Sequence, residues 1–322
     1  MNCLICYNKL QKGEIDYHKV CINKFFNSEE IPIFEIDEDD LEKSAKTMIE
    51  KHFSVTGVQP KILLELISDK KTKIKKETSP KRTFFKIIFS ESNYILKIQS
   101  VQYKEVPENE DLTMHLANIC GIKTAKHCLI RLNSGNLAYL TKRFDRKGKN
   151  KIAVEDMCQL TNTLTERKYK LSNEKIGKTI DNFSTYPDVD KNIFFEIVLF
   201  SYISGNADMH LKNYSLMNEN KLIKITPAYD LLSTKLILKN LDPEDCALTI
   251  NGKKKNLTLK DFLVFGKTLG LNENQINHYL NSYVKNKIKL FNKIKSSFLS
   301  ETAKDEYISL IDSRLRLLKI IN

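Results

Sequence analysis

The stretch SGNADMHLKN, residues 204–213, decides how the second half of this chain folds. It directly follows IFFEIVLFSYI, residues 193–203, which is apolar enough to form a buried helix. A polar group that is buried without a partner costs about 1 to 3 kcal/mol. The stretch must therefore give its side chains either structural hydrogen-bond partners or a ligand. After Ser204, five more polar side chains gather in it: Asn206, Asp208, His210, Lys212 and Asn213.

The spacing of the acidic and amide residues indicates phosphoryl transfer. Asn213 follows Asp208 by five positions, and Asp230 comes later in TPAYDLLST. Protein kinases use an Asp that accepts the hydroxyl proton, an Asn five residues on and a second Asp on a later loop. We predict that Asp208 deprotonates the attacking hydroxyl and that Asn213 and Asp230 give oxygen ligands to Mg²⁺. A structural interpretation stays open, in which Asp208 and Asn213 only bond the backbone at a capped helix end.

Further parts of a kinase precede this stretch in the expected order. FSVTGVQPK, residues 53–61, opens the first expected strand, and its Gly57 lets the backbone approach phosphates closely. Lys97 lies mid-strand in YILKIQS, where a buried ammonium needs an anionic partner. Glu110 is the first candidate for that partner and Glu108 the second. A lone strand lysine could instead extend to water, so this interpretation depends on the order of the parts.

Sheet patterns dominate the first half of the chain and helical patterns the second half. Alternating or apolar runs bounded by turn residues predict strands within 55–67, 82–90, 93–100, 127–132 and 137–145. Helical spacing predicts helices within 108–122, where a glycine ends the helix, 157–164, 192–204, 259–270, 273–299 and 304–321. We therefore predict an α+β fold with a Cys/His segment, a β-rich N-lobe and a helical C-lobe, at residues 1–45, 46–145 and 146–322.

Composition places the chain among ordinary globular proteins. It has 322 residues, of which 41% are hydrophobic and can form a sizeable core. The net charge of +12, from 52 Lys and Arg against 40 Asp and Glu, favours anionic partners. The start of the chain turns polar too early for a signal peptide, and residues 193–204 are too few for a membrane span and include Glu196. We expect a cytoplasmic protein whose seven cysteines are thiols or metal ligands.

Several motifs between about residue 54 and residue 235 carry a family resemblance: SVTGVQPK, YILK, PENE, KRFDR, EDMCQL, SGNADMHLKNYSL and PAYDLL. Together they resemble the HipA-type serine/threonine kinases, which are toxins of bacterial toxin–antitoxin modules. The resemblance implies a two-lobed, protein-kinase-like fold that binds ATP and Mg²⁺, with Asp208 as the catalytic Asp and Lys97 at the ATP phosphates. It also places His210 and Lys212 beside the phosphates. The hinge that meets adenine through backbone groups would be Lys142, Arg143 and Phe144.

The family autophosphorylates a serine in the glycine-loop region, which maps here to Ser54, with Thr56 as the second candidate. A phosphate adds about −1.5 to −2 charges beside the ATP phosphates. We therefore expect autophosphorylation to weaken nucleotide binding and to act as an off state. The two residues could also be ordinary hydroxyls at a strand edge.

The resemblance implies partners as well. Family members usually have a HipB-like DNA-binding antitoxin, so that contact with DNA would be indirect, and the implied substrate is a translation component such as an aminoacyl-tRNA synthetase. Longer members carry an extra N-terminal subdomain, whereas this chain has only about 50 residues before the glycine loop. It is therefore closer to the short HipT-like toxins, and a small HipS-like protein could supply the missing part.

The N-terminal segment departs from the family pattern. Cys3 and Cys6 form a Cys-x-x-Cys pair, and His18 and Cys21 form a His-x-x-Cys pair shortly after it. Four such ligands suit one tetrahedral Zn²⁺. The alternative is a packing cluster, since a free cysteine often behaves as a small hydrophobic residue.

Rival functions remain at the level of the sequence. A catalytically degenerate chain could act as an ATP-binding or DNA-binding regulator of a toxin–antitoxin complex. The positive charge and the N-terminal cysteine pairs would also suit a zinc-containing nucleic-acid binder, whose DNA affinity should depend steeply on salt. A small-molecule kinase is a third alternative, because the catalytic parts do not encode the acceptor.

Overall fold

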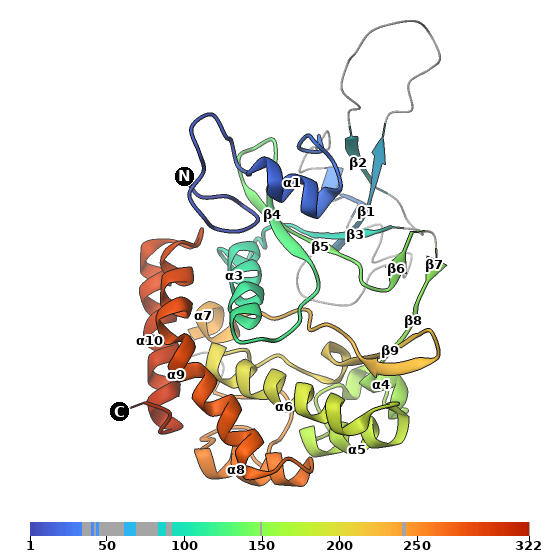
Figure 1. The fold of residues 1–322 in the computed structure, drawn as a ribbon, viewed down its shortest axis with the longest axis vertical. Coiled ribbons are helices and arrows are strands. Elements are labelled where there is room, and N and C mark those ends of the chain that lie inside the picture. Colours follow the sequence, from blue (N-terminus) through green and yellow to red (C-terminus); the bar gives the residue numbers. More distant parts are fainter. Residues whose placement is uncertain are drawn as a thin grey trace, which may run out of the picture. The chain divides into compact units, whose positions relative to one another are not determined.

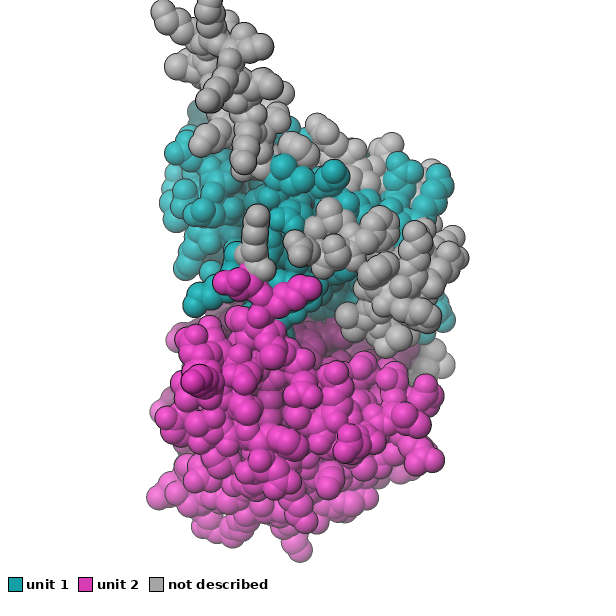
Figure 2. Space-filling model, turned by 90° about the vertical axis from the view of Figure 1, so that its right-hand side faces the viewer, with its two compact units in different colours: residues 1–111, 126–149 teal, residues 112–125, 150–322 magenta. Residues whose placement is uncertain are grey.

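The structure is a computed structural model that describes residues 1–33, 40–41, 43–44, 61–68, 83–87, 92–148, 150–239 and 243–321. The chain divides into two compact units, which Figure 2 colours separately. Unit 1 consists of Met1–Asp111 and Lys126–Lys149, and unit 2 consists of Leu112–Ala125 and Asn150–Asn322.

Unit 1 is built on a five-stranded antiparallel sheet with the strand order β2-β1-β3-β5-β4 (Figure 1). Ile62 and Leu64, two positions apart on β1, are fully buried, in agreement with the predicted alternation. The strands are β1 (Lys61–Ser68), β2 (Thr83–Ile87), β3 (Tyr94–Lys97), β4 (His127–Arg131) and β5 (Leu137–Lys142).

An aromatic cluster joins helix α1 (Lys19–Phe26) to this sheet. The ring of Phe26 meets that of Phe85 with centroids 6.0 Å apart, and Phe85 meets Tyr94 at 5.6 Å, both edge-on. Edge-on pairs of this kind add about 0.5–1.5 kcal/mol each beyond the burial of their area. The N-terminal segment is thus a packed part of unit 1.

Helix α3 (Val106–Ile119) carries residues of both units, because its first six belong to unit 1 and the rest to unit 2. It ends before Gly121, whose φ of +98° suits glycine and stops the helix as predicted. Two short strands follow β5, namely β6 (Arg146–Lys147) in unit 1 and β7 (Asn150–Lys151) in unit 2.

Helix α6 (Pro187–Ser204) is the centre of unit 2. A proline stands in its first turn, nearly all of its last twelve residues are buried, and Gly205 ends it with a φ of +71°. A Cβ atom on Gly205 would lie 2.7 Å from Leu310, so the end of the helix is closely packed. The other helices that the structure describes in unit 2 are α4 (Met157–Leu160), η1 (Thr165–Arg167), α5 (Asn173–Phe183), η2 (Leu211–Asn213), α7 (Thr234–Leu238), α8 (Leu259–Thr268), α9 (Glu273–Lys295) and α10 (Glu301–Leu317).

Unit 2 also contains an antiparallel sheet of order β10-β9-β8, formed by β8 (Ala153–Asp156), β9 (Ser215–Glu219) and β10 (Leu222–Ile225). The prediction of a helical second half missed this sheet. Its hairpin turns through Asn220 and Lys221, which both have positive φ, as the tight two-residue turn requires. The sheet frames the stretch 204–213, since β9 starts two residues after Asn213. None of the helices in the described ranges is both long and apolar enough to cross a bilayer.

Candidate active site

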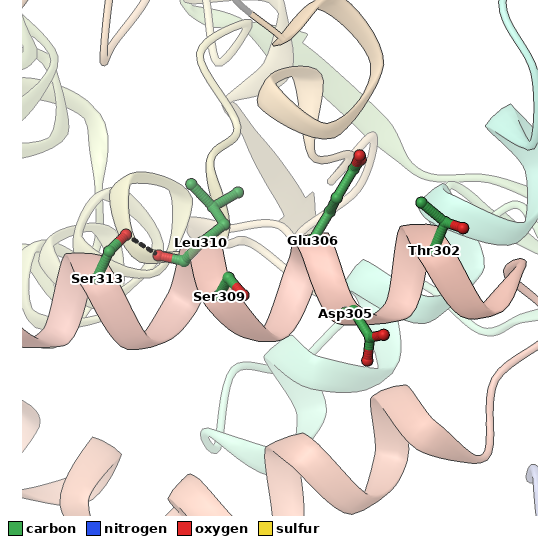
Figure 3. A pocket seen from close by; sticks show the side chains of 6 residues that line it. All are labelled: Thr302, Asp305, Glu306, Ser309, Leu310 and Ser313. Atoms are coloured by element: carbon green, nitrogen blue, oxygen red, sulfur yellow. Dashed lines mark hydrogen bonds between the residues drawn. The ribbon is translucent and has the colours of Figure 1, made fainter.

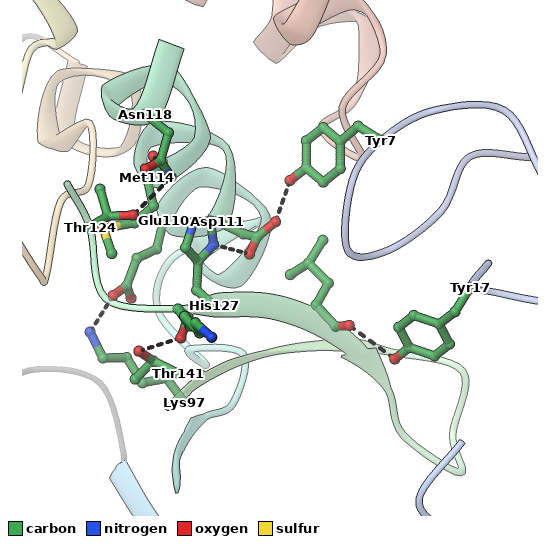
Figure 4. Close-up of polar contacts among 12 residues, drawn as sticks. Tyr7, Tyr17, Lys97, Glu110, Asp111, Met114, Asn118, Thr124, His127 and Thr141 are labelled. Atoms are coloured by element: carbon green, nitrogen blue, oxygen red, sulfur yellow. Dashed lines mark hydrogen bonds and ion pairs between the residues drawn. The ribbon is translucent and has the colours of Figure 1, made fainter. Parts of the chain in front are cut away.

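In unit 1, Lys97 and Glu110 form a buried ion pair. The ammonium group of Lys97 lies 2.5 Å from Oε1 of Glu110, and the two side chains are only 6% and 2% exposed (Figure 4). Strand β3 presents the lysine, and the second turn of α3 presents the glutamate. The ring of Tyr139, which stands opposite Lys97 on β5, lies 5.5 Å from the ammonium. The pair forms with the first of the two glutamates considered from the sequence.

The second candidate, Glu108, is half-buried elsewhere on α3. Its Oε2 atom has no hydrogen-bond partner among the described residues. Burial raises the pKa of this carboxyl to about 7. A carboxyl that titrates near neutral pH is a weaker partner for a lysine than one that stays ionised.

A chain of hydrogen bonds runs beside the Lys97–Glu110 pair (Figure 4). The Tyr7 hydroxyl donates to Oδ2 of Asp111 at 2.7 Å, and Nδ1 of His127 lies 2.7 Å from Oδ1 of the same carboxylate. All three side chains are buried. Burial and the adjacent Asp111 raise the pKa of Tyr7 well above its usual value, so the phenol remains a donor. The chain anchors the N-terminal segment to the helix that carries Glu110.

The predicted hinge, Lys142 to Phe144, begins at the last residue of β5. The backbone N–H of Lys142 donates to the carbonyl of Lys126 at 2.7 Å, and that of Arg143 to the carbonyl of Asn93 at 2.8 Å. The backbone N–H groups of Lys142 and Arg143 are therefore already hydrogen-bonded. If adenine binds here, its backbone partners would be carbonyl groups of this segment or the backbone of Phe144.

The side chain of Arg143 is held by its neighbours. It donates to both carboxylate oxygens of Asp145, at 2.9 and 2.7 Å, and to the Ser92 hydroxyl at 3.3 Å. Burial acts to raise the pKa of Asp145, but the hydrogen bonds and charge of Arg143 outweigh it and lower this pKa. Any role of Arg143 in nucleotide binding thus falls to its backbone.

In unit 2, the stretch 204–213 folds into a turn that holds Asp208 and Asn213 together. The backbone N–H of Asp208 donates to Oδ1 of Asn206 at 3.1 Å, and the side-chain amide of Asn213 donates to the carbonyl of Asp208 at 2.9 Å. This bond is the backbone contact that the structural interpretation expects. It also fixes the amide, so that the oxygen of Asn213 is the atom left for a ligand.

Asp208 receives a further hydrogen bond that the sequence did not indicate. The Tyr169 hydroxyl donates to Oδ1 of Asp208 at 2.7 Å, and the ring of Tyr169 packs edge-on against His210. Asp208 itself is partly exposed. The carboxylate therefore has one oxygen oriented by Tyr169 and a second, Oδ2, that can accept a hydrogen bond from a hydroxyl group.

His210 is buried at the centre of this cluster, and its Nδ1 atom has no hydrogen-bond partner among the described residues. Burial lowers the pKa of His210, although the charges of Asp208 and Asp230 act to raise it. Asp230 has a φ of +58°, so its backbone is held in an uncommon conformation. Because His210 is uncharged near neutral pH, it would meet a phosphate as a hydrogen-bond donor.

Lys212 is paired with an acid from another element. Its ammonium lies 2.6 Å from Oδ2 of Asp156, the residue that caps α4 and ends β8. The Lys212 carbonyl accepts a 2.8 Å bond from the Tyr229 hydroxyl. Asp156, at the end of β8, thus holds Lys212 and with it the 204–213 turn in place. A phosphate at Lys212 would compete with the Asp156 carboxylate for the ammonium group.

Some predicted positions lie outside the described residues, namely Gly57, Ser54 and Thr56. Their proposed roles in phosphate binding and autophosphorylation stay predictions. The residues that the sequence did not single out are Tyr169, Asp156 and Tyr229. Asp156 could have been found, because it lies in the EDMCQL motif and caps a helix there.

The four N-terminal Cys and His residues also come together in unit 1. Ligand atoms of Cys3, Cys6, His18 and Cys21 all lie within 4.8 Å of one another. Burial, followed by the charges of the two other sulfurs, raises the pKa of Cys21 to about 12. Three thiolates could therefore not share this space without a positive charge among them.

A groove of about 650 Å³ is lined by residues of helix α10 alone (Figure 3). None of these residues belongs to the candidate sites described above. Its charged side chains, Asp305 and Glu306, are acidic, so it would repel nucleotide phosphates. It is not a candidate for the nucleotide site. The lining residues are Thr302, Asp305, Glu306, Ser309, Leu310 and Ser313.

Comparison with known proteins settles the family. Residues 53–290, well over half of the chain, match the family of HipA-like C-terminal domains. The chain belongs to the HipA family. The resemblance seen in the motifs is therefore confirmed, and the closer kinship with HipT-like members stays a prediction.

Three relatives show how far the likeness of this HipA-like chain extends. It is 34% identical over 181 residues to "Putative kinase Y4dM" of Sinorhizobium fredii, which is 52% of this chain and 43% of that protein. A "Putative kinase" of Haemophilus influenzae is 26% identical, and the match covers 99% of this chain and 98% of that protein. The "Serine/threonine-protein kinase toxin HipA" of Shewanella oneidensis is 28% identical, with 57% and 43% covered. The chain thus spans less than half the length of two of these relatives.

Solved structures confirm the fold. The HipA-like chain matches HipA from the Shewanella oneidensis complex of HipA, HipB and operator DNA with a TM-score of 0.67 and 21% identity, covering 85% of this chain and 71% of that one. The Helicobacter pylori proinflammatory kinase CtkA matches with a TM-score of 0.53 and 20% identity, covering 73% and 90%. At such low identities the likeness shows the fold alone. The predicted kinase-like α+β fold is correct.

Proposed function

We propose that this HipA-like chain is an ATP- and Mg²⁺-dependent protein serine/threonine kinase. The observation that carries the proposal is the buried ion pair of Lys97 and Glu110 in unit 1. Protein kinases need a strand lysine paired with a helix glutamate to hold the α and β phosphates of ATP. The kinase names of the relatives support the same activity.

In the proposed reaction, the acceptor hydroxyl oxygen bonds to the γ-phosphorus of ATP while the bond from that phosphorus to the β–γ bridging oxygen breaks, and ADP leaves. Asp208 takes the proton of the hydroxyl. Because Tyr169 already donates to Oδ1 of Asp208, Oδ2 is the atom left to receive this proton. The contacts of Asn206 and Asn213 hold the loop in place during the transfer.

The residues of unit 2 fit a magnesium ion by the chemistry of their donors. The amide nitrogen of Asn213 is used by the Asp208 carbonyl, so its oxygen is presented, and Asp230 adds a carboxylate. Both are hard oxygen ligands of the kind that Mg²⁺ takes beside phosphate oxygens. When bound, Mg²⁺ would neutralise the negative charge of the phosphates.

We further propose that the kinase is the toxin of a bacterial toxin–antitoxin module and arrests growth by phosphorylating a translation component, such as an aminoacyl-tRNA synthetase. One relative is named a kinase toxin, and a structure of its kind contains HipB and operator DNA. The partners would be a HipB-like antitoxin, which would make the contact with DNA, and a small HipS-like protein. Autophosphorylation at Ser54 or Thr56 would lower the affinity for ATP.

The test replaces Asp208 by Asn in the full chain. The substitution keeps the size of the side chain and an oxygen for Tyr169, so the fold and ATP binding should persist. Transfer of labelled phosphate from ATP to protein should disappear. Phosphoproteomics after brief expression of the parent and D208N proteins would identify the acceptor. Transfer by D208N at the parent rate would refute the assignment.

A further inference from the structure

Four side chains of the N-terminal segment converge with the spacing of metal ligands. Nδ1 of His18 lies 3.4 Å from the sulfur of Cys6 and 3.7 Å from that of Cys21, and Cys3 completes the group. Zinc bonds of about 2.3 Å to sulfur and about 2.0–2.1 Å to nitrogen place two tetrahedral ligands about 3.5 Å apart. The observed separations lie on either side of that value.

The state of His18 also favours a metal. Its Nε2 atom lies 2.9 Å from the carbonyl oxygen of Lys9 and 3.8 Å from a carboxylate oxygen of Glu14, and both groups only accept hydrogen bonds from it. Nε2 therefore carries the proton, and Nδ1 turns its lone pair toward the sulfurs. A backbone carbonyl commonly orients a zinc-binding histidine in this way.

Hydrogen bonds or packing alone account poorly for the cluster. The lone pair of Nδ1 accepts one thiol proton, yet the sulfurs of Cys6 and Cys21 lie at nearly equal distances from it. Cysteines that serve as packing residues are buried, as Cys128 and Cys158 are here. Cys6 and Cys21 are instead partly exposed.

The backbone around the first two cysteines forms a tight loop. The N–H of Tyr7 donates to the carbonyl of Cys3, and the N–H of Cys3 to the carbonyl of Asn8, both at 2.9 Å. Tyr7 has a φ of +64°, which turns the chain directly after Cys6. The loop brings the sulfurs of Cys3 and Cys6 to one side, and Cys21 reaches them from the first turn of α1.

We propose that Cys3, Cys6, His18 and Cys21 bind one Zn²⁺ in a closed tetrahedral site that stabilises unit 1. All four positions around the metal are taken by protein atoms, so the site is structural. The loop is tied to the rest of unit 1, because the Leu4 carbonyl accepts from the N–H of Leu129 on β4 at 3.1 Å.

Metal analysis of the full chain tests the proposal, independently of any kinase activity. We expect one zinc per chain in protein purified without chelator, and absorption bands of thiolate-bound tetrahedral Co²⁺ in protein produced with cobalt. Cys6→Ser and Cys21→Ser should each lose the metal. Cys158→Ser, a matched change of a free cysteine outside the cluster, should keep it.

A rescue variant guards against loss of folding. His18→Ala should lose zinc, whereas His18→Cys should retain it, since four thiolates also bind zinc. Parent protein that holds no zinc after growth in zinc-supplemented medium, and shows no thiolate–cobalt bands, would overturn the proposal and leave a packing cluster. Equal zinc in the parent and in both cysteine variants would overturn it as well.

Discussion

The hydroxyl of Tyr169 donates a 2.7 Å hydrogen bond to Oδ1 of Asp208. Tyr169 is 39% exposed, but partial desolvation and the neighbouring carboxylate of Asp208 raise the pKa of its phenol above the usual value, so it stays a donor near neutral pH. Its ring rests edge-on against His210, with centroids 5.1 Å apart. Tyr169 is therefore a positioning residue for the proposed base.

Tyr169→Phe keeps the ring and removes the donor, so we expect kcat to fall while KM for ATP stays unchanged. A hydrogen bond to a charged group contributes about 1.5–3 kcal/mol, which corresponds to a loss of at least about tenfold. Steady-state kinetics would show this split. Tyr186→Phe, at an exposed tyrosine of unit 2, is the matched control. An unchanged kcat in Y169F would mean that the bond does not orient Asp208.

Lys97→Met should abolish phosphoryl transfer and destabilise the fold, because it leaves Glu110 buried without its cation. Breaking a buried pair in this way costs about 3–5 kcal/mol. The double variant K97M/E110L should regain much of the stability in urea unfolding while remaining inactive. Lys267→Met is the control, since its 2.6 Å pair with Glu273 is exposed and should contribute less than about 1 kcal/mol. If Lys97→Met and Lys267→Met lower the free energy of unfolding by the same amount, the prediction is wrong.

Gly205→Ala should destabilise the protein more than Gly252→Ala. Both glycines have a similar positive φ, +71° and +74°, so the backbone strain of the two changes is comparable. A Cβ at Gly205 would lie 2.7 Å from Leu310, whereas nothing lies within 4 Å of one at Gly252. Overpacking of this kind costs about 1–3 kcal/mol more. Urea denaturation of both variants measures the difference, and a G252A protein as unstable as G205A would exclude the steric cause.

Glu196 should make stability depend on pH. Burial raises its pKa from 4.5 to about 7 in the folded chain. Between these values the unfolded chain has released the proton and the folded chain keeps it, so the free energy of unfolding falls as pH rises through this window. A shift of one pKa unit corresponds to about 1.4 kcal/mol, and the partial exposure of Glu196 reduces the total. The free energy of unfolding should therefore fall by about 2–3 kcal/mol over this window.

Glu196→Gln removes this titration, so the variant should be more stable than the parent at pH 8 and no more stable at pH 4.5. Urea unfolding at the two pH values provides the measurement. Glu155→Gln, at an exposed glutamate of β8, is the control and should be as stable as the parent at both pH values. If the free energies of unfolding of E196Q and the parent differ by the same amount at pH 4.5 and pH 8, the Glu196 carboxyl does not titrate between these values in the folded chain.

The sequence predicted elements whose cause is local. The apolar run 193–203 and Gly205 specify the later part of α6 and its end, although the helix begins at Pro187, five residues before the predicted start, and alternation specifies β1 and β3. Lys97 and Asp208 could be singled out because a charge beside apolar residues needs a partner. The predicted helix over 157–164 was too long, since α4 ends at Leu160 and Asn162 has a φ of +51°.

The sheet of unit 2 could not be read from local pattern. β8 and β9 pair across a long sequence separation, and residues of β10 such as Leu222 remain partly exposed, so the strands lack a clear alternation of buried and exposed residues. Tyr169 was missed for a related reason. A tyrosine in a polar stretch carries no sign of its partner, and only the tertiary fold brings it to Asp208.

The packing of Gly205 against Leu310 has a consequence for how the protein is made. Leu310 belongs to α10, which a ribosome produces later than every other helix of the described chain. The nascent polypeptide can therefore complete the support of its 204–213 turn only after α10 has emerged from the exit tunnel. Until then the growing chain carries Asp208, the proposed base, in a turn whose packing against α10 is incomplete.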